Sequence, residues 1–365
     1  MGAKDQSLNR SRLDRLRFCF SELHADALLV SHPANIRYLC GFTGSAGLLL
    51  VELAKATLFT DSRYTFQAKE EVSGARIQIA KDGIVKAAGE ALRKQGGQPL
   101  VAYSANHLTV AQKEALHAAS GASVRWLKDA SVVERLRAVK DREELARIRE
   151  AAELISEVFR RALPFIKPGI SELELAGKME YTMKELGASG ASFETIVASG
   201  PRSAWAHARP TAKLLKKSEL VVLDQGAILR GYCSDLTRTV FLGRISPKLR
   251  GMYGAVLEAQ EAAKKAIRPG ATAGEVDAAA RGVLRRRGLA KYFTHSTGHG
   301  LGLEVHEMPR LGRGEKFVLQ EGMVVTVEPG IYVQGTGGIR IEDDVVVQAG
   351  GAADLTNATR ELIEI

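Results

Sequence analysis

Short apolar blocks separated by polar and glycine-rich stretches run through the first 130 residues. Helical spacing marks four apolar positions near the N-terminus, namely Leu13, Leu16, Phe20 and Leu23. Three apolar runs predict short buried strands at residues 27–30, 48–51 and 57–61. A glycine-punctuated turn at residues 41–47 precedes the second strand, and a helix that extends to Glu71 follows the third. Strands separated by helical segments are typical of an α/β domain.

A domain boundary is expected after residue 130. We interpret residues 131–140 as a linker between an N-terminal domain, residues 1–130, and a second domain, residues 141–365. The second domain begins with a long amphipathic helix whose apolar positions share one stripe: Leu145, Ile148, Ala152, Ile155 and Phe159. Pro164 and Pro168 are expected to end this helix.

The second domain contains an internal repeat. The motif Ile-Lys-Pro-Gly at 166–169 recurs as Ile-Arg-Pro-Gly at 267–270, and each copy lies between two predicted helices. The second helices of the two copies are expected at Glu172–Leu186 and Ala273–Arg287. Residues 221–226 likewise resemble residues 325–330 at nearly the same offset. Either match alone could arise by chance, but two in register favour one duplicated unit of two helices and several strands, with a site at the junction of the halves.

Four carboxylates occupy equivalent positions of the two halves: Asp224 and Asp235, then Glu328 and Glu342. Each pair flanks a glycine-containing turn, so folding the hairpin brings its two acids to roughly facing positions, where like charges destabilise each other. One such pair would more often be exposed to solvent. Two equivalent pairs beside apolar strands instead favour a buried site, because unpaired buried carboxylates are costly. Two divalent cations would balance the four negative charges.

Three of the eight histidines lie in one glycine-rich segment, residues 295–307. Glycines at 298, 300 and 302 allow close backbone approach around His299, whose imidazole is a natural metal ligand. His306 then remains available to donate or accept a proton, and His295 is interpreted as structural. His207 lies in a loop of the first half, where a lone histidine is more often a surface residue than part of a site.

Composition excludes several classes of protein. The chain has 365 residues, a formal charge of +9, 45% hydrophobic and 25% charged residues, which is ordinary for a folded protein of about two domains. No apolar run approaches the ~18 residues of a membrane span or a signal peptide, so neither a membrane partner nor export is expected. The scattered cysteines Cys19, Cys40 and Cys233 exclude a disulfide framework and fit the cytoplasm. The basic clusters lack interleaved aromatic residues, which argues against nucleic-acid binding.

Five segments together resemble the signatures of the pita-bread metallopeptidases, at residues 223–226, 234–239, 296–302, 328–330 and 340–343. Within that group the chain is most similar to Xaa-Pro aminopeptidases and prolidases. Residues 35–47 and 59–64 resemble their creatinase-like N-terminal domain. The resemblance implies an α/β creatinase-like N-terminal domain followed by an α+β pita-bread catalytic domain with an internal pseudo-twofold repeat.

Carried over residue by residue, the resemblance assigns five metal ligands: Asp224, Asp235, His299, Glu328 and Glu342. It also implies that His207 and His306 contact substrate, which gives His207 a role in the site. Glu328 is our candidate proton carrier as well as a ligand, and Arg340 is expected to orient Glu342 or a substrate group. Four carboxylates and one imidazole suit two divalent ions, with manganese first and cobalt, zinc or iron as alternatives. Gln225 departs from the apolar residue of many relatives but leaves every ligand in place.

The implied activity is hydrolysis of the bond between an N-terminal residue and a following proline. A strict Xaa-Pro dipeptidase needs a positive group for the substrate carboxylate, and Arg63, Arg209 or Arg340 could supply it. The N-terminal motifs look more like those of the bacterial aminopeptidases, so we favour an Xaa-Pro aminopeptidase and keep the dipeptidase as the alternative. Rival interpretations are a methionine aminopeptidase, a metal-free creatinase-like hydrolase and a non-catalytic binding protein. The resemblance also implies a homodimer.

Overall fold

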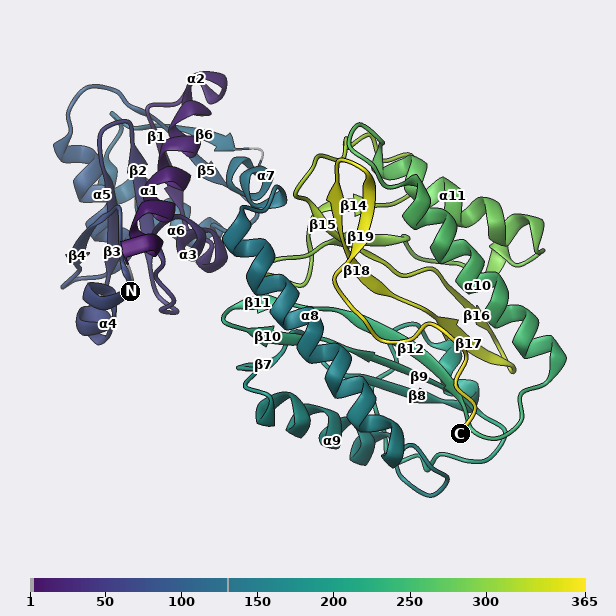
Figure 1. Cartoon of the computed structure of the whole chain (residues 1–365). Helices are drawn as coiled ribbons and strands as arrows, with labels where there is room; N and C mark the ends of the chain where they lie inside the picture. Colours follow the sequence, from purple (N-terminus) through teal and green to yellow (C-terminus); the bar gives the residue numbers. More distant parts are fainter. Residues whose placement is uncertain (1–2, 130) are drawn as a thin grey trace. The chain divides into compact units, whose positions relative to one another are not determined.

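The structure is a computed structural model that describes residues 3–129 and 131–365. The chain forms two compact units, residues 1–137 and 138–365 (Figure 1). Helix α7 (Val132–Ala138) occupies most of the segment that we interpreted as a linker, where no helix was predicted, and the boundary between the units falls at its end.

The first unit is built on a mixed six-stranded sheet with the order β4-β3-β2-β1-β5-β6. Its strands are β1 (Ala27–Val30), β2 (Leu48–Glu52), β3 (Ala56–Thr60), β4 (Arg76–Ile79), β5 (Leu100–Ser104) and β6 (Arg125–Asp129). Its helices before α7 are α1 (Ala3–Phe18), α2 (Phe20–Leu23), α3 (Pro33–Cys40), α4 (Thr65–Glu71), α5 (Ile84–Lys94) and α6 (Val110–Ser120). Strand β1 pairs antiparallel with β2 and parallel with β5, and all four of its residues are buried. The predicted α/β domain and its first three strands are therefore confirmed.

The second unit begins with helices α8 (Arg142–Ala162) and α9 (Glu172–Glu185), close to their predicted limits. Asp141 caps α8 by accepting hydrogen bonds from the backbone N–H groups of Glu143 and Glu144, both at 3.0 Å. The strands of this half are β7 (Gly190–Ala191), β8 (Ile196–Ser199), β9 (Leu220–Gln225), β10 (Ala227–Leu229), β11 (Tyr232–Cys233) and β12 (Leu236–Phe241). A short 3₁₀ helix, η3 (Gly200–Ala204), follows β8.

The second half repeats this plan with helices α10 (Pro247–Ala266) and α11 (Ala273–Arg286). Its strands are β13 (Gly298–Gly300), β14 (Glu307–Leu311), β15 (Val324–Val327), β16 (Gly330–Val333), β17 (Gly337–Arg340), β18 (Asp343–Gln348) and β19 (Gly351–Asp354). The antiparallel order β8-β9-β12 of the first half corresponds to β13-β15-β18 in the second. Helices α8 and α9 pack on the strands of the first half, and α10 and α11 pack on those of the second (Figure 1).

Matching local details confirm the predicted repeat. Gly169 and Gly270 both have positive φ angles, 96° and 86°, which favour glycine. Their N–H groups donate to equivalent carbonyls, of Leu215 and Leu319, both at 2.9 Å. The two halves therefore enter their second helices through the same turn.

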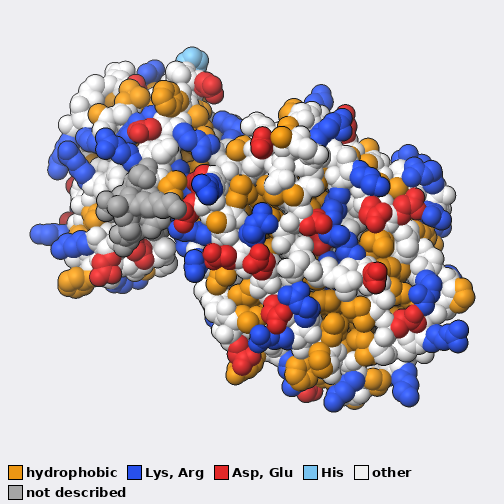
Figure 2. Space-filling view, in the orientation of Figure 1, with side chains coloured by type: hydrophobic (Ala, Val, Ile, Leu, Met, Phe, Trp, Pro, Cys, Tyr) orange, Lys and Arg blue, Asp and Glu red, His pale blue; other side chains and the backbone are white. Residues whose placement is uncertain are grey.

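The surface of the protein carries charges of both signs. On the face displayed in Figure 2, Lys and Arg side chains are mixed with Asp and Glu rather than gathered into one basic stripe. Within residues 3–129 and 131–365, no helix combines the length and the apolar character needed to cross a bilayer.

Candidate metal centre

The five predicted ligands lie in strands of the second unit or directly beside them. Asp224 lies in β9 and His299 in β13. Asp235 directly precedes β12, Glu328 directly follows β15, and Glu342 directly precedes β18. Each half thus supplies one pair of acids.

Strand register places the two acid pairs differently. Strand β15 pairs with β18, and β16 pairs with β17, in one continuous register. Glu328 and Glu342 lie between these two pairings and are therefore directly opposite each other. In the first half Asp224 pairs with Thr237, so Asp224 and Asp235 are diagonal neighbours. The expectation of facing acids holds for the second pair and is wrong by two residues for the first.

Close backbone packing explains the glycines around His299. A Cβ atom on Gly298 would lie 1.9 Å from the carbonyl oxygen of Thr326, and one on Gly300 would lie 2.1 Å from that of Met308. Only glycine fits at these two positions. The Nδ1 atom of His299 lies 3.1 Å from the carbonyl oxygen of Gly300, which leaves Nε2 directed at the acids.

One cleft of about 390 Å³ collects every residue that the sequence assigned to the site: His207, Asp224, Asp235, His299, His306, Glu328, Arg340 and Glu342. The remaining lining residues are Phe193, Glu194, Ile196, Ala208 and Arg209. His207 and His306 are exposed on the wall of this cleft. His207 is therefore both a surface residue and part of the candidate site.

Donor atoms converge closely enough to share cations. His299 Nε2 lies 3.4 Å from Glu328 Oε1 and 3.8 Å from Asp235 Oδ2. One ligand atom each from Asp235, His299 and Glu342 lie within 4.8 Å of one another. Among the described residues, Oδ1 of Asp224 and Oδ1 of Asp235 are buried with no hydrogen-bond partner. Buried carboxylate oxygens without protein donors fit cation ligands, because such groups are otherwise costly.

The electrostatics of the cleft also fit a cation site. Burial, followed by repulsion from Glu342 and Asp224, raises the pKa of Asp235 well above its usual value. Burial, with repulsion from Glu328, does the same to the pKa of Glu342. Burial raises the pKa of Glu328 to about 7, although Arg340 opposes the shift. These acids cannot all ionise beside one arginine, so divalent cations would supply the missing positive charge.

Arg340 organises the floor of the cleft. Its guanidinium forms an ion pair with Asp224 and donates to Thr237 Oγ1 at 3.0 Å and to the Tyr332 hydroxyl at 2.7 Å. Thr237 in turn donates to Glu342 at 2.6 Å. Arg340 therefore reaches Asp224 directly and Glu342 through Thr237, which refines its expected orienting role. The sequence analysis missed Tyr332, because a tyrosine in a strand has no signal that separates it from a core residue.

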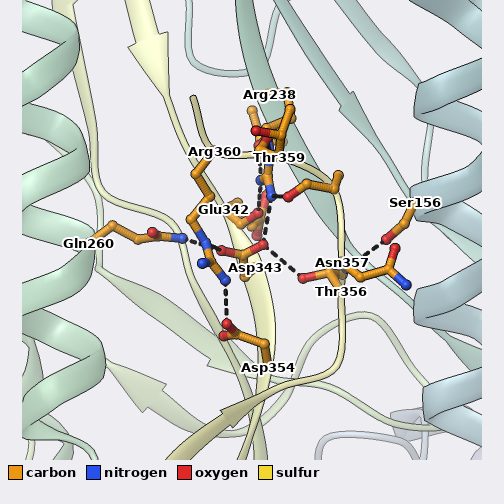
Figure 3. Close-up of polar contacts among 12 residues, drawn as sticks. Ser156, Arg238, Gln260, Glu342, Asp343, Asp354, Thr356, Asn357, Thr359 and Arg360 are labelled. Carbon is orange, nitrogen blue, oxygen red and sulfur yellow. Dashed lines mark hydrogen bonds and ion pairs between the residues drawn. The ribbon is translucent and has the colours of Figure 1, made fainter. Parts of the chain in front are cut away.

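A second polar cluster lies immediately behind Glu342, centred on buried Asp343 (Figure 3). Asp343 accepts hydrogen bonds from Arg238, Arg360, Gln260 and Thr356. Its pKa lies below the usual value, because burial, which alone would raise it, is outweighed by the two arginines. Arg238 also donates to the backbone carbonyl of Glu342, so this cluster holds the ligand strand from behind.

His295 lies outside the lining of the cleft, in keeping with the structural role predicted for it. Its Nε2 atom lies 2.9 Å from the Tyr332 hydroxyl and its Nδ1 atom 2.7 Å from the carbonyl oxygen of Ser296. Burial, aided by nearby Arg340, lowers the pKa of His295 to about 4. The folded protein therefore holds this imidazole neutral at neutral pH.

Acidification is expected to destabilise the fold through His295. Unfolding returns its pKa from about 4 to about 6.5, so the unfolded state binds the extra proton as the pH falls between these values. Because one pKa unit corresponds to about 1.4 kcal/mol, the free energy of unfolding should fall by on the order of 2 kcal/mol between pH 7 and pH 5. Urea unfolding at both pH values measures this decrease in the free energy of unfolding. The decrease should be smaller in His295→Gln than in wild type, whereas His24→Gln, at an exposed position, should match wild type. An equal loss in His295→Gln would contradict this account.

Another group of potential ligands lies in the first unit: His32, His107 and Glu134. The two imidazole rings are stacked, with centroids 3.7 Å apart and planes inclined by only 14°. A bound metal lies in the plane of each ligating ring, about 2.0–2.1 Å from its nitrogen. Two nearly parallel stacked rings cannot meet that requirement for one ion, so this arrangement is not a metal site.

Comparison with known proteins gives matches over both units. Residues 146–349 match metallopeptidase family M24, and residues 12–139 match the creatinase/prolidase N-terminal domain. The Xaa-Pro dipeptidase of Pyrococcus furiosus is 37% identical over 355 residues, which cover 97% of this chain and 100% of that protein.

Solved structures agree over the whole chain. The Xaa-Pro dipeptidase from Bacillus anthracis superposes with a TM-score of 0.94 at 38% identity, covering 98% of this chain and 100% of that one. The X-Pro aminopeptidase from Thermotoga maritima gives a TM-score of 0.89 at 35% identity, covering 97% and 99%. These likenesses confirm the predicted creatinase-like and pita-bread architecture. With its catalytic signatures gathered in one acid-lined cleft, the chain belongs to metallopeptidase family M24.

Proposed function

We propose that this protein is a divalent-metal Xaa-Pro dipeptidase, a prolidase. The observation that carries the proposal is the cleft of five candidate ligands in a chain that is similar over its full length to proteins named Xaa-Pro dipeptidase. Further relatives above 30% identity are also named dipeptidase or prolidase. These names favour our alternative, the dipeptidase, over the Xaa-Pro aminopeptidase that the N-terminal motifs suggested. The similar structure from Thermotoga maritima is nevertheless named an X-Pro aminopeptidase.

The metal ligands would be Asp224, Asp235, His299, Glu328 and Glu342. Bound divalent ions lower the pKa of water towards neutrality and polarise carbonyl groups, which is the chemistry that amide hydrolysis needs. The hard oxygen donors make manganese our first choice, with cobalt, zinc or iron as alternatives. Metal analysis of the purified protein decides among them.

The other polar groups of the cleft would act on the peptide itself. His306 and His207, which both line the cleft, would donate hydrogen bonds to the oxyanion that develops from the carbonyl before proline. The leaving prolyl nitrogen has no N–H of its own and must be protonated as the bond breaks. Glu328, whose pKa of about 7 suits proton transfer at neutral pH, is our candidate carrier of that proton.

A dipeptidase also needs a cation for the substrate carboxylate. Of the three arginines considered from the sequence, Arg63 is paired with Asp61, and Arg340 is buried against Asp224. Arg209 lines the cleft but is paired with Glu194 at 2.9 Å. None of these three is ready to receive a new anion without losing an existing partner.

Arg310 is a better candidate, and the sequence analysis overlooked it. It lies directly opposite His299 in the pairing of β13 with β14, and directly opposed residues project to the same face of a sheet. Arg310 is exposed, and within the described part of the chain its side chain makes no hydrogen bond or ion pair. We infer that its guanidinium receives the carboxylate of a C-terminal proline.

Substrate comparison tests the proposal. We expect kcat/KM for an Xaa-Pro dipeptide to exceed that for Xaa-Pro-Xaa-Xaa and for the Xaa-Pro amide by at least tenfold, since discrimination is a ratio of these constants. Arg310→Met should remove this preference, lowering only the dipeptide value by roughly 10–100-fold, because a charge-assisted hydrogen bond contributes about 1.5–3 kcal/mol. Arg209→Met is the matched control and should keep the preference. Equal or faster cleavage of the longer peptide would make the protein an aminopeptidase.

Two further expectations stay predictions. The family resemblance implies a homodimer, which light scattering of the purified protein tests. The scattered positions of the three cysteines favour a cytoplasmic location, which fractionation of the source cells tests.

A further inference from the structure

A single buried carboxylate holds both ends of the loop that carries His207. Glu172, the first residue of α9, is fully buried. Its Oε1 accepts hydrogen bonds from the N–H and the hydroxyl of Ser199, where β8 ends, both at 2.9 Å. Its Oε2 accepts from the N–H and the hydroxyl of Thr211, at 3.1 and 2.8 Å. Residues 200–210, here called the His207 loop, are thus closed at their base by Glu172.

Arg202 extends this contact into the loop. Its Nε donates to Glu172 Oε2 at 3.0 Å, and its Nη2 donates to the backbone carbonyl of Arg209. The same guanidinium lies over the ring of Trp205, 4.9 Å from its centroid. The carboxylate of Glu172 therefore orients an arginine that spans the loop on both sides of His207.

The cleft side of the loop is fixed by the metal-site machinery. Arg340, which is paired with Asp224, donates to the carbonyl of Ala206 at 3.0 Å. His207 is the next residue and lines the cleft. Glu172 and Arg340 thus hold the same loop from its base and from its inner face, which limits the positions that the imidazole can take.

The internal repeat shows that the fold alone does not require this acid. Ser171 and Thr272 cap the second helices of the two halves, so Glu172 corresponds to Ala273. Ala273 is fully buried in an apolar cluster of the second half. The same turn is therefore built with alanine in the second half, where the corresponding segment, between β13 and Val318, carries His306. The turn itself does not require the acid, which is found only in the half that carries His207.

We propose that Glu172 is a positioning residue of the active site, which keeps the His207 loop closed so that His207 faces the peptide bond under attack. The inference rests on the proposed peptidase function for its catalytic consequence. It names a residue that touches neither the cleft nor the candidate ligands. Glutamine cannot replace it, because the amide nitrogen of Gln donates hydrogen bonds and cannot accept them from Thr211 or Arg202.

The test compares Glu172→Gln with Glu174→Gln, an exposed acid two residues along the same helix. Glu172→Gln should lower kcat/KM by roughly 10–100-fold, since a misplacement of about 1 Å can cost that much. Its metal content should match wild type. Hydrogen exchange of residues 200–210 should become faster, and Glu174→Gln should change none of these quantities.

Coupling to His207 separates positioning from general stability. In a His207→Ala background, Glu172→Gln should lower kcat/KM by less than about threefold, because the group that it positions is already gone. Fully additive losses, or unchanged exchange in the loop, would overturn the proposal. If Glu172→Gln does not fold, Thr211→Val removes one donor to the same carboxylate and takes its place. If the wild type cleaves no Xaa-Pro dipeptide, the proposed function is wrong, while loop exchange still decides whether Glu172 holds the loop.

Discussion

Asp235→Ala and Glu342→Ala are each expected to abolish peptide hydrolysis and to lower the bound metal, while the protein stays folded. Each acid supplies an oxygen atom to the group that includes His299, within 4.8 Å. Loss of a direct ligand should cost more than the roughly 10–100-fold that loss of an outer-shell partner costs. The fold should survive, because mutual repulsion and burial already raise the pKa of both acids and removing one relieves that repulsion.

Metal content measured by mass spectrometry, activity and circular dichroism together check this expectation. Glu321→Ala, an exposed acid close to the start of β15, is the control and should behave as wild type. A chelator should abolish activity in the wild type, and manganese should restore it. Full activity in a chelated, metal-free sample would rule out the proposed metal site.

Much of this site could be predicted because the chain repeats itself. The offset between the two halves predicted that Asp224 and Glu328 lie at the ends of corresponding strands. In the structure Asp224 lies near the end of β9, and Glu328 directly follows β15. The glycines at 298 and 300 signalled close packing around His299, which the contacts with Thr326 and Met308 confirm. Such features are local in sequence, so motif and spacing report them directly.

Other parts of the site depend on contacts that spacing does not encode. Asp224 and Asp235 are diagonal rather than facing, because Thr237 takes the position opposite Asp224. Arg310 is connected to the site by its pairing with His299, and Tyr332 by its hydrogen bond with Arg340. Nothing in their local sequence sets these two residues apart from ordinary strand residues. In our proposal the choice between dipeptidase and aminopeptidase depends on the cation Arg310, on which the N-terminal motifs carry no information.

His306→Ala is expected to keep its metal and to lose turnover by roughly 10²–10³-fold, the cost of removing one oxyanion-hole donor. The ring of His306 lies 4.4 Å from that of His299, centroid to centroid, with the planes inclined by 74°. His299 Nε2 already faces the acids, whereas His306 is exposed on the cleft wall, beside the space that a substrate would occupy. Burial and the neighbouring His299 lower the pKa of His306, so its imidazole is neutral at neutral pH and can donate one N–H.

The matched variant is His299→Ala, which removes the neighbouring imidazole and should lose both metal and activity. Metal content and kcat measured on the two variants separate a ligand from a group that acts on the substrate. The fall should appear in kcat more than in KM, because a hydrogen bond to the oxyanion forms only as the carbonyl is attacked. If His306→Ala loses metal and turnover in equal proportion, His306 is a ligand. A variant with unchanged kcat would instead assign oxyanion stabilisation to His207 alone, and the loop held by Glu172 would then carry that donor.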